Sequence, residues 1–322
     1  MKDSSLAIII PAYKGTFLKK TLQSISGQTN RNFTVYVGDD ASPENIAAIC
    51  QPFSGTINIV YHRFEGNVGG KDLVGQWNRC VDLAGAEEWI WLFADDDILE
   101  PTCVEAFHSA VEKTNSAFDV YRFDTLTIDQ NGDVIRTSPE NPMVENSEDL
   151  AYNILVGNRG NSMPDHIFRK SKYRELGGFV NFPFAQAADF ANSIAFSNPK
   201  GLYTIKGPKV RWRYSGLNIS SMAHRLKARA IFGYLAYMRW MVDKFKIGVN
   251  GSPYSGRLTQ GVVVKNFENV VKGHYRGIPY AKIMSVAREL AAMFGWTVGR
   301  SLMYCIKLNI RVEKHKLRKK LG

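Results

Sequence analysis

The sequence predicts an α/β fold in which helices flank a mostly parallel sheet, with a helical, basic C-terminal region. Three observations predict it. Short runs of β-branched and aromatic residues recur through the first half, amphipathic segments lie between them, and helical periodicity takes over near residue 220. Such runs suit the buried strands of a parallel sheet. Alternation of strand and helix implies right-handed crossovers.

The predicted strands share β-branched or aromatic composition and occupy residues 6–10, 33–37, 57–61, 89–93 and 120–123. Two helices are predicted from apolar stripes at helical spacing, Phe17, Leu18, Leu22 and Ile25 in one and Leu73, Trp77, Val81 and Ala84 in the other. Residues 125–137 predict a hairpin around Asn131-Gly132, followed by a helix over 149–156 and a strand over 166–168.

Residues 222–246 and 279–309 carry apolar residues at helical spacing, and the Gly-, Pro- and Ser-rich segment 248–256 separates them as a linker. Residues 311–322 form a basic tail. We therefore expect a domain over 1–220 that carries the chemistry and a helical basic region over 221–322, associated with a membrane or an acceptor.

The net charge of +11 is divided unevenly along the chain. Residues 1–199 hold 16 Lys and Arg against 26 Asp and Glu, whereas residues 200–322 hold 25 against 4. This asymmetry favours an anionic partner for the second half, and the simpler alternative is a solvated basic surface. The basic helix over 279–309 is expected to lie on an anionic membrane; the alternative is that it packs on the sheet domain.

The expected location is the cytoplasm, with peripheral association at the inner face of the cell membrane. The apolar run 6–10 is too short for a signal peptide, and no run of about 18 apolar residues is present for a membrane span. Four widely spaced cysteines without a regular framework favour a reducing compartment.

Three polar segments follow predicted strands directly: Pro11-Ala12-Tyr13, Gly38-Asp39-Asp40-Ala41-Ser42 and Ala94-Asp95-Asp96-Asp97. Ligands of open α/β sheets bind beyond the carboxyl ends of the strands. Adjacent carboxylates repel one another, so a divalent cation, Mn²⁺ or Mg²⁺, that bridges to a substrate diphosphate explains the third segment. The alternative is a solvated acidic turn before a helix that begins near Pro101.

Together these segments resemble glycosyltransferase family 2, whose members transfer sugars with inversion and have the Rossmann-like GT-A fold. The resemblance covers residues 6 to about 220. It implies that Pro11, Ala12 and Tyr13 contact the uridine and that Asp40 accepts a hydrogen bond from uracil N3. Asn67-Val68-Gly69 matches the N-x-G loop of the family, and Gln76 to Arg79 lie on the helix that follows it.

Residues 93–101 fall where the family has its D-x-D region, but Ala94 replaces the usual first Asp. The resemblance then implies metal binding by Asp97, with Asp96 at the ribose or around the metal and Asp95 beside the donor. Gly177-Gly178-Phe179 followed by Asp189 resembles the catalytic-base region, although Ala188 stands in place of its Glu. An ordinary charge at a helix N-terminus is the alternative for Asp189.

Residues 211–220 resemble the loop that closes over the diphosphate, with Arg213 assisting. Of the six histidines only His166 falls near the expected acceptor site, and a buried or surface histidine is the simpler interpretation.

The resulting expectation is a metal-dependent, inverting glycosyltransferase. Its donor would be a nucleotide-diphosphate sugar, most simply UDP-linked, and its acceptor a glycan or lipid-linked molecule of bacterial surface polysaccharide; no nucleic acid partner is expected. The alternatives are a nucleotidyltransferase of similar fold and a non-catalytic basic adaptor on membrane or nucleic acid.

Overall fold

The computed structural model describes residues 5–216, 227–249, 254 and 256–321. The chain forms two compact units. The first contains Met1–Leu150, Arg159–Asn181 and Ala188–Ser215; the second contains Ala151–Asn158, Phe182–Ala187 and Gly216–Gly322. The predicted boundary at residue 220 lies outside the described residues. The prediction of one boundary does not account for Ala151–Asn158 and Phe182–Ala187, two short segments that belong to the second unit.

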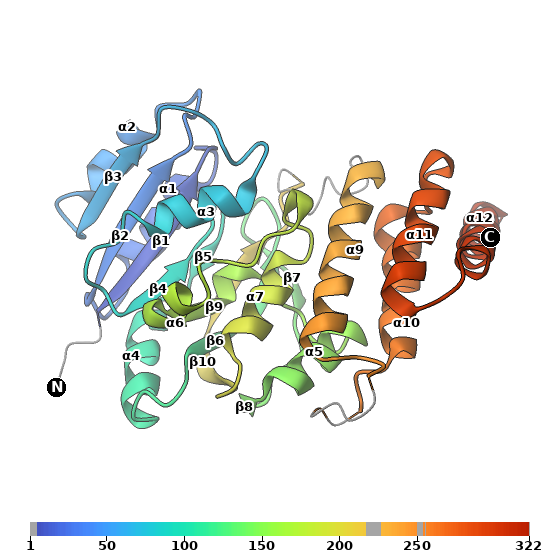
Figure 1. Cartoon of the computed structure of the whole chain (residues 1–322). Helices are drawn as coiled ribbons and strands as arrows, with labels where there is room; N and C mark the ends of the chain where they lie inside the picture. Colours follow the sequence, from blue (N-terminus) through green and yellow to red (C-terminus); the bar gives the residue numbers. More distant parts are fainter. Residues whose placement is uncertain (1–4, 217–226, 250–253, 255, 322) are drawn as a thin grey trace. The chain divides into compact units, whose positions relative to one another are not determined.

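The first unit is built on a sheet with the strand order β3-β2-β1-β4-β9-β6-β10-β5 (Figure 1). Strands β1, β2, β3 and β4 run parallel to one another, as do β6 and β10, whereas β9 is antiparallel to its neighbours β4 and β6. The strands span Leu6–Ala12 (β1), Phe33–Asp39 (β2), Ile59–Arg63 (β3), Trp89–Leu92 (β4), Ile98–Leu99 (β5), Val120–Ile128 (β6), Val134–Thr137 (β7), Val144–Glu145 (β8), His166–Arg169 (β9) and Leu202–Arg213 (β10).

Helices connect these strands as the alternation predicts. They span Leu18–Ser26 (α1), Ile46–Cys50 (α2), Leu73–Val81 (α3), Cys103–Lys113 (α4), Ser147–Leu155 (α5), Lys170–Glu175 (α6) and Ala188–Phe196 (α7), with short 3-10 turns at Gln51–Phe53, Met163–Asp165 and Pro183–Ala185. The side chains of Leu18, Leu22 and Ile25 are buried on one side of α1. The amphipathic pattern therefore identifies the face of this helix that packs on the sheet.

The core lies between the sheet and its helices and is rich in aromatic side chains. Trp91 stacks on Phe123 with ring centroids 5.3 Å apart, and Trp89 meets the edge of Phe107 at 5.5 Å. The indole N–H of Trp91 donates to the carbonyl of Pro164 at 2.6 Å. This buried hydrogen bond connects β4 to the segment before β9. Asp165 and His166, two polar residues of the site described below, follow Pro164 directly.

The predicted α/β architecture, a mostly parallel sheet flanked by helices, is confirmed. The predicted hairpin is confirmed as well, because β6 and β7 pair antiparallel across residues 129–133. The expectation for residues 211–213 is wrong. They are the last residues of the strand β10, paired with β6, and not part of a loop. Residues 217–220 of the predicted closing loop lie outside the described residues.

The second unit is helical over its described residues. Its long elements are α9 (Lys227–Lys244), α10 (Gln260–Val270), α11 (Ile283–Phe294) and α12 (Val298–Leu321), with a π-helical turn at Val271–Tyr275 and a 3-10 turn at Tyr280–Lys282. The predicted helix over 279–309 is interrupted at Gly295, whose φ of 64° ends α11. The predicted tail is helical as well, because α12 continues to Leu321. Most of the predicted linker 248–256 lies outside the described residues.

The helix expected to lie on a membrane uses part of its apolar surface inside the protein, although Ile283, Met293 and Phe294 are only partly buried. Val286 and Leu290 are fully or almost fully buried, so this side of α11 packs inside the second unit. Such burial removes apolar surface from water within the protein itself. Among the described residues no helix is both long enough and apolar enough to cross a membrane.

Candidate functional site

The carboxyl ends of β1, β2 and β4 meet at one edge of the sheet. The amide of Asp40 donates to the carbonyl of Ala12 at 2.9 Å, and the amides of Tyr13 and Lys14 each donate to Asp95 Oδ2 at 3.2 Å. The parallel register of the strands causes this convergence. The structure thus brings together the three polar segments that follow predicted strands, and Tyr13 is 41% exposed beside them.

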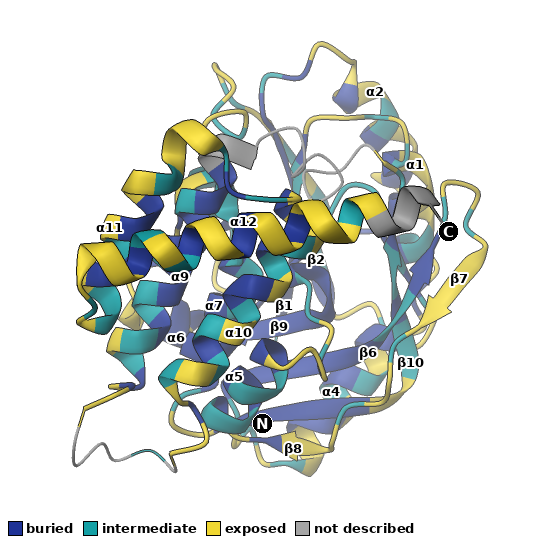
Figure 2. Ribbon diagram, turned by 90° about the vertical axis from the view of Figure 1, so that its right-hand side faces the viewer, coloured by how far each residue is buried: buried dark blue, intermediate teal, exposed yellow. Residues whose placement is uncertain are grey.

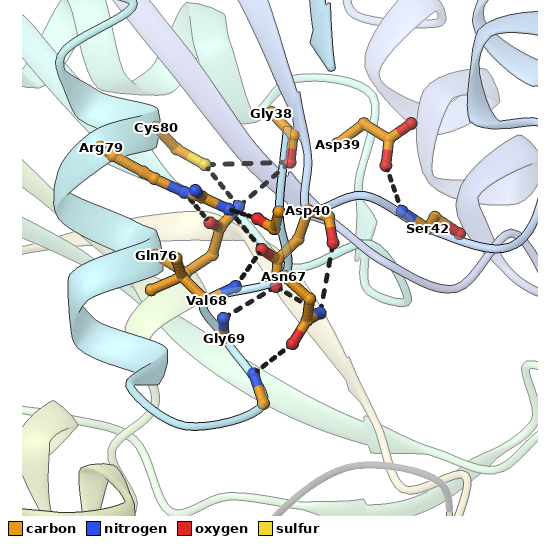
Figure 3. A network of polar contacts seen from close by, with 12 residues as sticks. Gly38, Asp39, Asp40, Ser42, Asn67, Val68, Gly69, Gln76, Arg79 and Cys80 are labelled. Atoms are coloured by element: carbon orange, nitrogen blue, oxygen red, sulfur yellow. Dashed lines mark hydrogen bonds and ion pairs between the residues drawn. The ribbon is translucent and has the colours of Figure 1, made fainter. Parts of the chain in front are cut away.

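Asp40 is the centre of a buried polar network (Figure 3). Its carboxylate accepts hydrogen bonds from the amides of Val68 at 2.7 Å and Gly69 at 2.8 Å and from Asn67 Nδ2 at 2.9 Å, and it forms an ion pair with Arg79. Asp40 and Asn67, both predicted to bind the nucleotide-sugar donor, are therefore in contact. Asp40 is 3% exposed and these protein donors surround it, so its contact with a base stays a prediction.

Asp39, one residue earlier, has a structural set of partners. It accepts hydrogen bonds from Tyr61 Oη at 2.6 Å, from Arg63 Nη1 at 2.7 Å and from the amide of Ser42 at 2.8 Å. Ser42 Oγ in turn donates to the carbonyl of Tyr13 at 2.6 Å. These bonds fix the loop after β2 against the loop after β1.

The three acidic residues after β4 differ in exposure and in partners. Asp95 and Asp96 are partly exposed, whereas Asp97 is fully buried. Asp97 Oδ1 accepts a hydrogen bond from the amide of Arg213 at 2.7 Å, and Oδ2 has no hydrogen-bond partner among the described residues. Burial raises the pKa of Asp95; burial and then the charge of Asp95 raise the pKa of Asp96 to about 7; burial and then Asp96 raise the pKa of Asp97 well above its ordinary value.

A divalent cation fits this acidic segment. Burial and then mutual repulsion disfavour the charged forms of Asp96 and Asp97, and Asp97 Oδ2 is a buried oxygen without a hydrogen-bond partner among the described residues. In the described part of the chain, no three His, Cys, Asp or Glu side chains converge closely enough to hold a metal ion by themselves. Mg²⁺ is commonly held by one or two carboxylates together with substrate phosphates, and such a site needs no larger cluster.

Arg213 is a buried support for the acidic segment. Its guanidinium donates to the carbonyl of Asp96 at 2.7 Å and to that of Asp129 at 2.8 Å, and it lies 4.5 Å from the ring centre of Phe17. The side chain is fully buried. A contact of Arg213 with a diphosphate stays a prediction. In the structure Arg213 supports the acidic segment, through the backbone carbonyl of Asp96 and the carboxylate of Asp97.

Asp165 and His166 form a second buried polar pair near the acidic segment. Asp165 accepts hydrogen bonds from Ser162 Oγ at 2.7 Å and Thr125 Oγ1 at 3.1 Å, and His166 Nδ1 lies 3.4 Å from its carboxylate. Burial alone would raise the pKa of Asp165, but His166 and Ser162 hold it below its ordinary value. His166 is 1% exposed and its Nε2 has no hydrogen-bond partner among the described residues, so it is a buried histidine as expected.

Asp189 lies in the first turn of α7 and is partly exposed. Burial raises its pKa to about 7; the backbone amide of Phe190 partly opposes this shift, and the smaller effects of Asp165 and His166 raise and lower it. The contact with the Phe190 amide is the one expected of an acidic residue at a helix N-terminus. A carboxyl group with a pKa near neutrality is also suited to proton transfer at physiological pH, so the role of Asp189 as a base stays a prediction.

Helix α3 supports both the Asp40 network and the segment before Asp189. Arg79 binds Asp40, while its neighbour Asn78 accepts hydrogen bonds from the amide of Phe179 at 3.0 Å and from Tyr173 Oη at 3.0 Å. Gly178 has φ = +108° and passes so close that a Cβ there would lie 3.2 Å from Asn78 Oδ1. The Gly177-Gly178-Phe179 segment therefore owes its shape to α3.

Sequence reasoning missed several of these supports, namely the roles of Asn78, Arg79, Asp165 and Asn192. Asn192 on α7 receives the amide of Val180 at 2.8 Å and donates to its carbonyl at 3.2 Å, which fixes α7 to the Gly178 segment. Single polar residues on helices have no distinctive spacing. Of these supports, only Asp165 could have been suspected from the sequence. It stands beside His166 before an apolar strand, and polar groups buried there need hydrogen-bond partners inside the protein.

The fold and this site define a GT-A glycosyltransferase. The glycosyl transferase family 2 model matches residues 7–177, more than half of the chain, and the chain belongs to that family. The matched range includes the acidic segment and Asp165 but ends before Asp189. Membership in the family separates the chain from nucleotidyltransferases of similar fold.

Individual relatives agree with this assignment. The chain is 28% identical over 274 residues to the amylovoran biosynthesis glycosyltransferase AmsB of Erwinia amylovora, an alignment that covers 76% of this chain and 87% of that protein. It is 26% identical over 175 residues to an uncharacterized glycosyltransferase of Haemophilus influenzae, which covers 54% of this chain and 55%, about half, of that relative.

Among solved structures, residues 1–349 of S. aureus TarS in complex with UDP-GlcNAc superpose with a TM-score of 0.69. The superposition covers 98% of this chain and 92% of that chain at 14% identity. At this identity the similarity shows the fold alone. It extends beyond the family match into the C-terminal helices.

Proposed function

We propose that this glycosyltransferase transfers a sugar with inversion from a nucleotide-diphosphate sugar, most simply a UDP-sugar, to a glycan or lipid-linked acceptor of bacterial surface polysaccharide. The observation that carries the proposal is the convergence of the polar segments after β1, β2 and β4 at one edge of the sheet. Asp189 supports it as a partly exposed carboxyl group in the first turn of α7, whose pKa burial raises to about 7. AmsB, a relative over most of its length, is an amylovoran biosynthesis enzyme, which supports a polysaccharide acceptor.

The donor would bind at the edge where β1, β2 and β4 end. Backbone groups of Pro11 and Ala12, the exposed ring of Tyr13, and the Asp40–Asn67 network line this edge and would contact the nucleoside. Structures of TarS with UDP-GlcNAc and with UDP support a uridine nucleotide as the ligand of this fold. Asp95 holds the Tyr13 loop by accepting hydrogen bonds from two of its amides.

In the proposed reaction Asp189 takes the proton of the acceptor hydroxyl as the hydroxyl oxygen attacks the anomeric carbon. The bond to the diphosphate breaks in the same step, so the configuration inverts and no covalent sugar–protein intermediate forms. A base is most effective when its pKa lies near the working pH, and burial brings the pKa of Asp189 to that range.

Asp97 and Asp96 are proposed to hold Mn²⁺ or Mg²⁺. When bound, such an ion would supply positive charge to the leaving diphosphate. Asp97 offers Oδ2, which no described residue contacts by a hydrogen bond, and Asp96, whose side chain is more accessible, offers a second oxygen. The Arg213 guanidinium binds the backbone carbonyl of Asp96, and the Arg213 amide donates to the carboxylate of Asp97.

A donor-hydrolysis screen tests the proposal without knowledge of the acceptor. Purified protein is incubated with UDP-, GDP- and TDP-sugars, with and without Mn²⁺, and release of the nucleotide is measured. We expect slow, Mn²⁺-dependent hydrolysis of one or more UDP-sugars. Hydrolysis restricted to GDP- or TDP-sugars would change the donor, and release without any metal dependence would remove the metal from the proposal.

A further inference from the structure

Helix α12 carries an exposed apolar stripe. The side chains of Met303, Ile306, Ile310 and Leu317 are 53%, 39%, 50% and 59% exposed. Their spacings of three, four and seven residues place them on one side of an α-helix. Figure 2 shows exposed residues along the outward side of α12 for most of its length.

The opposite side of α12 is already packed. Ser301, Cys305, Leu308 and Val312 are buried, again at helical spacing. Asn309 donates to the carbonyl of Ile278 at 2.8 Å and accepts from its amide at 2.7 Å, which fixes the helix to the rest of the second unit. The exposed stripe is therefore a second apolar face in addition to the one that the fold uses.

Cations accompany the exposed stripe. Lys307 and Lys314 follow Met303 and Ile310 by four residues, so each is exposed beside an apolar side chain one turn earlier. From residue 298 to 321 the sequence contains eight Lys and Arg and a single acidic residue, Glu313, which pairs with Lys316. The stripe thus lies on a helix of strongly positive charge.

We propose that the exposed face of α12 docks on an anionic lipid surface, with the helix lying in the plane of the membrane. Apolar side chains flanked by cations are the pattern by which an amphipathic helix binds an anionic bilayer interface. A second copy of the chain fits less well, because pairing two such faces would bring lysines together. A nucleic acid would use the cations but leave the apolar stripe without a partner.

The test is co-sedimentation with vesicles of phosphatidylcholine alone or mixed with phosphatidylglycerol. We expect binding only to the mixed vesicles, weakening as salt is added. The double variant Lys307→Glu/Lys314→Glu should bind at least about tenfold more weakly, since one basic residue near an anionic surface contributes about fivefold. Met303→Gln/Ile310→Gln should also bind at least about tenfold more weakly, because it removes two apolar side chains from the docking face. Truncation of the helix is avoided because Val312 is part of the core.

Met143→Gln is the matched control, because Met143 lies in the first unit and is 51% exposed. It should bind vesicles like the natural protein, and every variant should hydrolyse donor at the natural rate in solution, so this test is independent of the proposed function. Equal binding to both vesicle types, or undiminished binding by both double variants, would overturn the proposal. So would a dimer in sedimentation velocity that Met303→Gln/Ile310→Gln dissociates, because the face would then bind a second copy.

Discussion

The pKa of Asp189 links the chemistry of this residue to the stability of the fold. Burial raises this pKa to about 7, well above the value of an exposed aspartate. The folded protein therefore binds a proton at Asp189 between about pH 4 and pH 7 that the unfolded chain does not bind. In that range the contribution of Asp189 to stability falls as the pH rises, and above pH 7 the buried anion is a net cost.

Asp189→Asn should consequently stabilise the protein at pH 8 and leave its stability at pH 4 nearly unchanged. One pKa unit corresponds to about 1.4 kcal/mol, and partial exposure of the side chain reduces the effect, so we expect a gain of about 2 kcal/mol at pH 8. Urea denaturation at the two pH values measures it, with the exposed Asp133→Asn as the control. Equal stability of natural and variant protein at pH 8 would mean that the surroundings of Asp189 do not disfavour its charged form.

The acidic segment allows a comparison between two neighbouring carboxylates. Asp96→Asn and Asp97→Asn each remove one proposed metal ligand, so each should weaken Mn²⁺-dependent UDP binding by about tenfold or more while leaving metal-free binding unchanged. The amide side chain introduced by Asp97→Asn retains an oxygen that can accept the hydrogen bond of the Arg213 amide, so this variant should remain folded. Calorimetric titration of UDP with and without Mn²⁺ measures both. Unchanged affinity in one variant would assign the metal to the other residue, and unchanged affinity in both would remove it from this segment.

Helix α3 has an effect beyond its own packing, because Arg79 neutralises the buried Asp40. Arg79→Ala would leave that carboxylate without its counter-ion, and such losses are strongly destabilising even when the intact pair contributes little. Arg79 is partly exposed, so we expect a loss of about 2 kcal/mol in the free energy of unfolding together with weaker UDP binding. Arg174→Ala, at an exposed position, is the control. A variant with natural stability and UDP affinity would show that the Asn67-Val68-Gly69 loop holds Asp40 by itself.

In the second unit, Gly233 on α9 lies against the 3-10 turn at Pro183–Ala185. A Cβ at residue 233 would lie 2.1 Å from the carbonyl oxygen of Pro183, so the turn would have to move. The chain continues from this turn to Asp189 within a few residues. Gly233→Ala should therefore lower the free energy of unfolding by about 1–3 kcal/mol and reduce donor hydrolysis as well.

Gly299→Ala in α12 is the matched control, because a Cβ there would meet no atom within 4 Å. It should be neutral or stabilising by up to about 1 kcal/mol, as expected for alanine in a helix. If both substitutions had the same effect on thermal unfolding, the close contact at Gly233 would not matter.

The sequence was most informative where periodicity and burial coincide. The β1 and β2 strands and the α1 stripe follow directly from apolar patterning, because a buried face imposes its period on the chain. It was least informative where a few residues depend on distant partners. β10 was missed because Gly207 and Pro208 interrupt its pattern, and the break between α11 and α12 depends on one glycine in the left-handed region.

The site shows the same difference. Asp95, Asp96 and Asp97 stand out because adjacent carboxylates after an apolar strand are unusual, and their convergence with Tyr13 follows from the parallel sheet. By contrast, the partners of Asp96 and Asp97 come from β10, a strand more than a hundred residues away in the sequence. Arg213 at its end donates from its amide to the Asp97 carboxylate and from its guanidinium to the Asp96 carbonyl. Pairings of this kind are set by tertiary structure and leave no local signal.

On the scale of the whole molecule, the acidic and basic residues are divided between the two units, and so are the proposed functions. The first unit carries the acidic segment, Asp40 and Asp189, which are the groups of the proposed transfer chemistry. The second unit carries the basic helices and the exposed stripe on α12. If the acceptor is lipid-linked, a membrane-binding second unit would concentrate the enzyme and its acceptor on one surface.

The central claim is an inverting transfer from a nucleotide sugar with Asp189 as the base, and proton NMR of donor hydrolysis tests it most directly. With an α-linked UDP-sugar and Mn²⁺ we predict that the β-anomer of the free sugar appears first, and that Asp189→Asn releases it about 100-fold more slowly with unchanged UDP affinity. Initial release of the α-anomer, or an Asp189→Asn protein as fast as the natural one, would contradict the account.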